Sequence, residues 1–117
     1  MEGPDIIAVT PAGNIGVIEC TVGLPNHNSK LAKVVEKTLS IRDRLNTAGF
    51  SHLQVQPVVV TPLTREAVKA NWQDAAKLGI ALICKEDIEE LLKRIELPPN
   101  PERLFDEAKQ LIPVMDE

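Results

Sequence analysis

Aromatic residues are scarce in this chain, at 3% of 117 residues, and tyrosine is absent. The hydrophobic core must therefore be aliphatic, and runs of valine and isoleucine supply it. Cysteine occurs only at Cys20 and Cys84, each inside an apolar run and without CxxC or Cys/His spacing. We therefore expect two buried free thiols in preference to a disulfide or a metal pair.

Long apolar runs are also missing, because no segment reaches the roughly eighteen residues that a membrane-spanning helix needs. The N-terminus lacks the basic-then-apolar layout of a secretory signal, so we expect a cytoplasmic protein with no membrane contact. No GxGxxG, P-loop or GxSxG pattern occurs, which leaves the mechanisms that depend on those motifs without support. The net charge of -4 argues against a globally basic nucleic-acid binder but is compatible with a local basic patch.

The length of 117 residues suits one domain, and 44% hydrophobic with 26% charged residues is ordinary for a globular protein. The chain is organised around residues 4–21, which read as two β-rich runs, 6–10 and 15–22, joined by a Pro-Ala-Gly-Asn turn. Asp5 stands at the start of the first run and Glu19 near the end of the second, both in apolar surroundings.

The hairpin register decides how these two acids meet. A symmetric hairpin sets Asp5 opposite Cys20 and diagonal to Glu19, whereas a shift of one residue sets the acids directly opposite, with Cβ atoms about 5 Å apart. Both runs are apolar on both faces, which is typical of central strands covered on each side. Two carboxylates in such a place resist ionisation unless a cation neutralises them, and this predicts a metal site.

A helix is expected over residues 29–45, with Ser29 as its N-cap. Its predicted buried stripe consists of Leu31, Val34, Val35, Thr38, Leu39 and Leu45. A second stripe is basic and begins beside the acidic strand end; it consists of Lys30, Lys33, Lys37 and Arg44. An ordinary solvated helix face explains this basic stripe about equally well.

Further along, we expect a strand over 55–61, a helix from Thr64 to Leu78, a strand over 80–84 and a helix over 85–95. Pro57 lacks a backbone N–H, so its end of the strand should be unpaired or at an edge. Helices between the strands favour parallel pairing. Asn100 and Pro101 predict the start of a last helix, so we divide the domain into a core, 1–95, and a C-terminal helical appendage, 96–117.

These residues resemble the core of the PD-(D/E)XK, or restriction-endonuclease-like, nuclease superfamily. Pro4-Asp5 lies at one strand, and Ile18-Glu19-Cys20-Thr21 lies in the next strand, ahead of a helix. The later segments VVVT and GIALICKEDIEELL are similar to the end of Mrr-like restriction endonuclease domains, so that the resemblance covers about residues 4–95. It implies an α/β fold with a mixed β-sheet core flanked by helices.

The resemblance also implies a function. In that superfamily the Asp and the Glu bind a divalent cation together with the carbonyl of the residue after the Glu, so Asp5, Glu19 and Cys20 would hold Mg²⁺, or alternatively Mn²⁺. The implied activity is hydrolysis of DNA phosphodiester bonds by an endonuclease. Asp5 and Glu19 would be catalytic as metal ligands.

The sequence departs from the family pattern at two points. Thr21 stands where the motif lysine belongs, and some relatives place that basic group on the following helix, where Lys30, or with slightly less support Lys33, could serve. The usual first helix and strand of the family are lacking, so we expect an unpaired sheet edge that a homodimer or another partner covers. These departures support two alternatives: a catalytically inactive nuclease-fold module for nucleic-acid binding or protein assembly, and an α/β domain whose acidic pair is structural.

Overall fold

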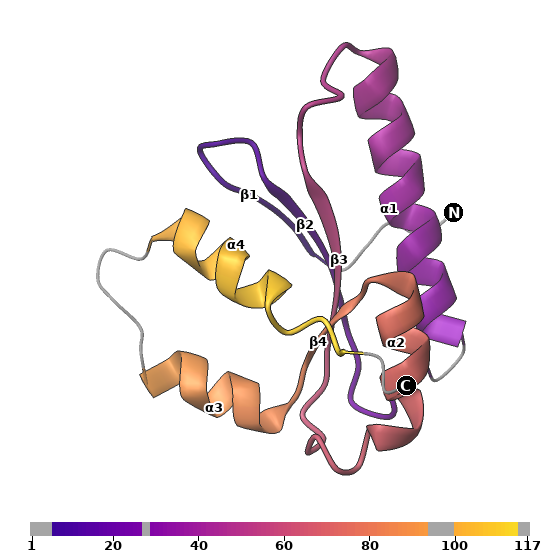
Figure 1. Cartoon of the computed structure of the whole chain (residues 1–117), viewed down its shortest axis with the longest axis vertical. Coiled ribbons are helices and arrows are strands. Elements are labelled where there is room, and N and C mark those ends of the chain that lie inside the picture. The colour runs from indigo at the N-terminus through magenta and orange to yellow at the C-terminus, as the bar shows by residue number, and fades with distance from the viewer. Residues whose placement is uncertain (1–5, 27–28, 94–99, 115–117) are drawn as a thin grey trace.

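The computed structural model describes residues 6–26, 29–93 and 100–114. Within them a four-stranded sheet has the order β1-β2-β3-β4, and its strands are β1 (Ile6–Val9), β2 (Ile15–Cys20), β3 (Val55–Val60) and β4 (Ala81–Ile83). The helices are α1 (Lys30–Thr47), α2 (Trp72–Leu78), α3 (Lys85–Lys93) and α4 (Pro101–Lys109), with a 3-10 turn η2 (Lys69–Asn71) before α2. Figure 1 shows α1 and α2 on one side of the sheet and α4 on the other. The predicted α/β class with a mixed sheet is confirmed.

The direction of each strand follows from its connection. β1 and β2 are joined by a tight turn and pair antiparallel, whereas helical crossovers lead from β2 to β3 and from β3 to β4, and these pairs are parallel as predicted. β1 lies at the edge of the sheet, and all four of its residues are exposed. The expectation that both strands of the hairpin are covered on each face is therefore wrong for β1, whose apolar residues form an open edge.

The hairpin has the shifted register rather than the symmetric one. Its described pairs run from Ile6 with Ile18 to Val9 with Ile15. The turn between the paired residues Val9 and Ile15 contains an odd number of residues. It is closed by two hydrogen bonds, from Thr10 N to Asn14 O (2.9 Å) and from Gly13 N to Thr10 O (2.9 Å), and Gly13 has a φ of 89°. The described pairing stops one residue short of Glu19, and Asp5 lies outside the described residues.

Pro57 is tolerated in the central strand β3 because of the direction its nitrogen faces. Thr21 N donates to Val60 O and Thr61 N donates to Ile83 O, so even-numbered residues of β3 bond toward β2 and odd-numbered ones toward β4. The pairing with β4 begins only at Val58. The prediction that this end of the strand is unpaired is thus confirmed on the β4 side.

The helix starts agree with the sequence in part. Asn100 caps α4 as predicted, with its side chain accepting a hydrogen bond from Arg103 N (3.2 Å) and Pro101 in the first turn. Ser29 precedes α1 in a left-handed conformation (φ 58°) and makes no capping hydrogen bond, so the predicted N-cap is wrong. Thr64 accepts from Ala67 N (3.2 Å), but the segment after it forms turns, η2 and the short α2 instead of one continuous helix.

The hydrophobic core lies between the sheet and α1 with α2. Its fully enclosed members include Val17, Leu31, Val34, Val59, Val68, Ala75 and Leu82. Thr38 is buried as predicted, but Leu39 is 48% exposed, which contradicts its place in the predicted buried stripe. Cysteine burial was predicted correctly for Cys84 and wrongly for Cys20, which is exposed, and no disulfide joins the two. No helix in the described ranges is long and apolar enough to cross a membrane.

Candidate functional site

Glu19 places a carboxylate inside the folded chain at the C-terminal end of β2. Strand alternation gives its side chain the same face as Ile15 and Val17, which is the face covered by α1. Its backbone lies in register with Val59 of the central strand β3. The residue is only 4% exposed, so its negative charge must be balanced by neighbouring groups.

Two lysines of α1 provide that balance. Lys37 Nζ donates to Glu19 Oε1 at 2.6 Å, and Lys30 Nζ lies 3.8 Å from Glu19 Oε2. Seven residues separate the two lysines, which is close to two helical turns, so both side chains project from the same side of α1. Their side chains are 15% and 26% exposed, and the cluster therefore forms at the border between core and solvent.

Lys30 contacts a second oxygen of the site. Its Nζ also donates to the backbone carbonyl oxygen of Cys20 at 3.0 Å. One ammonium group thus lies beside both a carboxylate oxygen of Glu19 and the next carbonyl oxygen along the strand. These are two of the three oxygen donors that the sequence predicts for a divalent cation.

The remaining predicted site residues are placed differently. Lys33 is exposed on α1 and makes no ion pair or hydrogen bond to Glu19 in the described part of the chain. Thr21 Oγ1 accepts a hydrogen bond from Gly23 N (3.2 Å), so this side chain shapes the loop after β2. Asp5 falls outside the described residues. The structure therefore brings together Glu19, Cys20 and Lys30, but not Lys33.

Lys37 is the residue that the sequence reasoning did not select. It belongs to the predicted basic stripe, yet it lies eighteen positions from Glu19 in sequence and outside the first turn of the helix. The available signal was its seven-residue spacing from Lys30, which places both side chains on the same side of the helix. Whether both reach the same neighbour depends on how the helix packs against the strand. That packing could not be read from the sequence.

The donor chemistry of the site suits a hard cation. A carboxylate and a carbonyl oxygen are ligands that Mg²⁺ accepts together with water molecules. The Lys30 ammonium lies near both oxygens, 3.0 Å from the Cys20 carbonyl and 3.8 Å from Glu19 Oε2. Within the described ranges no group of three or more His, Cys, Asp or Glu side chains gathers to hold a metal ion.

Comparisons with known proteins add no assignment. No family model, curated protein sequence or solved structure matches the chain. The geometry around Glu19 and the sequence pattern that contains it are therefore the observations that bear on function.

Proposed function

We propose that this chain is a divalent-metal-dependent, nuclease-like domain of the restriction-endonuclease-like type that hydrolyses DNA phosphodiester bonds. The observation that carries the proposal is the cluster of the buried Glu19 carboxylate, the Cys20 carbonyl and the ammonium groups of Lys30 and Lys37 at the end of β2. In such a cluster the carboxylate can hold a metal ion. The metal ion and the two lysines can then bind and polarise a phosphate. An acid needed only for folding is more easily replaced by an apolar residue.

Glu19 and the Cys20 carbonyl would hold Mg²⁺ or Mn²⁺, and Asp5 is the proposed third ligand. The resemblance implies Asp5 as a ligand, and Asp5 lies outside the described residues. The bound ion would supply Lewis-acid stabilisation of charge on the phosphate. Oxygen ligands suit either of these two ions.

The lysines have separate roles in this proposal. Lys37 holds Glu19 Oε1 at 2.6 Å and fixes the orientation of the carboxylate. Lys30 is the more exposed of the pair and its contact with Glu19 is longer, at 3.8 Å, so its ammonium can leave Glu19 and orient a water molecule or a phosphate oxygen. Lys30 would then do the work of the motif lysine that Thr21 lacks.

DNA is the proposed substrate because the cations near Glu19 belong to a longer basic surface. Lys33 and Arg44 are exposed on α1, the helix that also presents Lys30 and Lys37 to the site. Phosphate contacts from such side chains position a nucleic acid without reading its sequence. A local basic surface of this kind can operate in a chain whose net charge is -4.

The test is divalent-dependent cleavage of linear and circular DNA by the wild type and Glu19→Gln. We expect cleavage by the wild type with Mg²⁺ or Mn²⁺, and a loss of at least about 100-fold in Glu19→Gln, since several kcal/mol of transition-state stabilisation depend on the metal. Glu36→Gln, which changes an exposed acid of α1, is the matched control and should cleave normally. Equal cleavage by wild type and Glu19→Gln would refute the proposed site.

A second candidate function is a catalytically inactive module of the same fold that binds nucleic acid or assembles with a protein. Two observations favour it: Thr21 replaces the motif lysine and is engaged in a loop hydrogen bond, and Lys37 and Lys30 already neutralise Glu19. This module would bind Mn²⁺ or an oligonucleotide without cleaving any DNA. A chain that binds neither would leave the ion cluster with a structural role.

A further inference from the structure

A second polar site lies at the opposite end of the sheet from Glu19. A cavity of about 430 Å³ opens at the start of β3, between the C-terminal half of α1 and α4. It is lined by Arg42, Asn46, Ser51, Leu53, Gln54, Val55, Gln56, Phe105 and Lys109. We name it the Arg42–Lys109 pocket. Val55 lies four residues before Val59, the partner of Glu19, so this pocket is about 13 Å along the strand from the Glu19 cluster.

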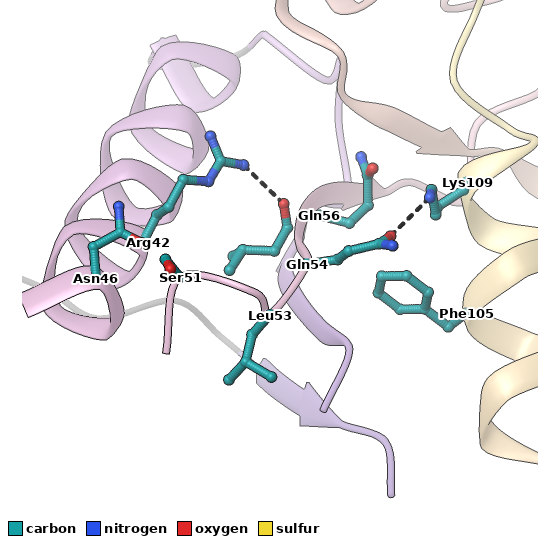
Figure 2. A pocket seen from close by; sticks show the side chains of 9 residues that line it. Arg42, Asn46, Ser51, Leu53, Gln54, Gln56, Phe105 and Lys109 are labelled. Atoms are coloured by element: carbon teal, nitrogen blue, oxygen red, sulfur yellow. Dashed lines mark hydrogen bonds between the residues drawn. The ribbon is translucent and has the colours of Figure 1, made fainter. Parts of the chain in front are cut away.

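Each helix brings a cation to the pocket. Figure 2 shows Arg42 reaching from α1 on one side, Lys109 from α4 on the other, and Gln54 between them. An Arg42 nitrogen donates to Val55 O (3.0 Å), and Lys109 Nζ donates to Gln54 Oε1 (2.9 Å). Both partners are neutral oxygens, so these bonds hold the side chains in place without cancelling their charges.

Among the described residues, no acid pairs with either of these two cations. The lining set contains no Asp or Glu, and neither Arg42 nor Lys109 forms an ion pair anywhere in the described ranges. Two uncompensated cations in one cavity are notable in a chain whose net charge is -4. Positive charge that is concentrated in this way, without a carboxylate partner, favours an anionic ligand.

The unused hydrogen-bond donors of the pocket also favour an anionic ligand. Arg42 uses one of the five N–H groups of a guanidinium, and Lys109 uses one of three. The amide nitrogens of Asn46 and Gln54 make no hydrogen bond within the described part of the chain, whereas the amide of Gln56 is engaged with Pro57 O and Gly79 O (both 2.8 Å). Several donors around one space match a ligand that carries several acceptor oxygens.

We propose that the Arg42–Lys109 pocket binds a phosphate group. Phosphate offers enough acceptor oxygens for a guanidinium, an ammonium and two amides at once, and the planar guanidinium can bind it through two parallel hydrogen bonds. Phe105 lies at the side of the pocket, with Lys109 Nζ 5.9 Å from its ring centroid, and provides an apolar surface against which a base or another flat group can pack. The phosphate can belong to a free nucleotide or to a nucleic-acid strand.

The test is an NMR titration of the full chain with inorganic phosphate, a mononucleotide and a single-stranded oligonucleotide, at matched ionic strength. We expect saturable shifts of the backbone amides of residues 51–54. Arg42→Gln and Lys109→Met should each weaken binding by about 10-fold or more, as expected for loss of one charge-assisted hydrogen bond. Saturation by the mononucleotide identifies a free nucleotide as the ligand, and saturation by the oligonucleotide alone identifies a strand.

Matched variants separate site binding from general attraction. Lys93→Met removes an exposed lysine of α3 that does not line the pocket, and Lys77→Met does the same on α2. Both should bind like the wild type, and thermal unfolding should show that all four variants are folded. Absence of saturable binding by every probe, or equal weakening in Lys93→Met and Lys109→Met, would overturn the proposal. Neither result depends on Glu19. DNA cleavage can therefore be absent while this pocket binds phosphate, and cleavage can be present while the pocket does not bind phosphate.

Discussion

At the scale of single residues, the cost of burying Glu19 depends on how its charge is balanced. Removing a carboxylate from water costs several kcal/mol unless close cations and hydrogen bonds replace the lost hydration. Lys37 supplies the short contact at 2.6 Å, and Lys30 supplies a longer one at 3.8 Å while it also binds the Cys20 carbonyl. The two lysines are therefore not equivalent, and only Lys30 contacts both oxygens that we assign to the metal.

This difference leads to a prediction for metal affinity. Replacing Lys30 by Met removes the cation that competes for Glu19 Oε2 and the Cys20 carbonyl, so Lys30→Met should bind Mn²⁺ several-fold more tightly than the wild type in calorimetric titration. Lys33→Met removes an equal charge from the same helix without touching these oxygens, and its Mn²⁺ affinity should stay close to that of the wild type. Equal affinity of Lys30→Met and wild type would show that Lys30 does not occupy the site of the ion.

Sequence reasoning at this scale found the acid and one of its two partners. Glu19 was identifiable because a charged residue interrupts an apolar strand, and Lys30 because it begins the next helix. Lys37 was missed because its contact with Glu19 depends on how α1 lies across β2, which residue spacing alone does not fix. Lys33 was selected on closeness in sequence, but its position around the helix axis leaves it exposed.

At the scale of elements, α1 carries the site and is anchored by a narrow apolar stripe. Leu31 is 1% exposed, whereas Leu39, which the sequence assigned to the same stripe, is 48% exposed. Leu31→Ala should lower the free energy of unfolding by about 2–5 kcal/mol. Leu39→Ala should change it by no more than about 0.5 kcal/mol. Urea unfolding of both variants measures this, and a similar loss in both would contradict the observed orientation of α1.

The first turn of α4 is tied to the β1–β2 turn by Glu102. Its carboxylate accepts hydrogen bonds from Thr10 Oγ1 (2.7 Å), Ala12 N (2.9 Å) and Asn14 Nδ2 (2.9 Å). The Thr10 hydroxyl, followed by the Ala12 amide, holds the pKa of Glu102 below its ordinary value of 4.5. This carboxylate therefore stabilises the fold when it is ionised.

The pH dependence follows from the sign of that shift. Because the pKa of Glu102 is lower in the folded chain, its contribution is present above pH 4.5 and is lost as the pH falls through the lowered folded value. Glu102→Gln should be less stable than the wild type at neutral pH, and the difference should shrink on acidification below pH 4.5. Unfolding measured from pH 7 to about pH 3 tests this. Glu66→Gln, which removes an exposed carboxylate outside α4, is the control for the loss of one negative charge.

Elements with strong local signals were predicted well, and those that depend on packing were not. The Val and Ile runs predicted the ends of β2, β3 and β4 to within one or two residues, and Asn100-Pro101 predicted the start of α4. The helix expected between Thr64 and Leu78 begins as turns and η2, because Val68 is drawn into the core before regular helix begins. The hairpin register was left open between two choices, and the hydrogen bonds of Thr10 and Gly13 decide between them.

At the scale of the whole molecule, the sheet separates two cationic clusters along its strands. Lys30 and Lys37 contact an acid at the C-terminal end of β2, whereas Arg42 and Lys109 hydrogen-bond to neutral oxygens at the start of β3. The first arrangement suits a metal ion and the second a phosphate group. The open edge at β1 remains available for the predicted second copy or partner, which stays a prediction.

The most direct measurement is a crystal structure of the chain soaked with Mn²⁺, in which anomalous scattering locates the ion. We predict one strong peak within coordination distance of the Glu19 carboxylate and the Cys20 carbonyl oxygen, with Lys30 Nζ moved away from both. A soaked crystal in which no Mn²⁺ lies near Glu19 and Lys30 keeps its contacts would contradict the metal site, and with it the proposed nuclease chemistry.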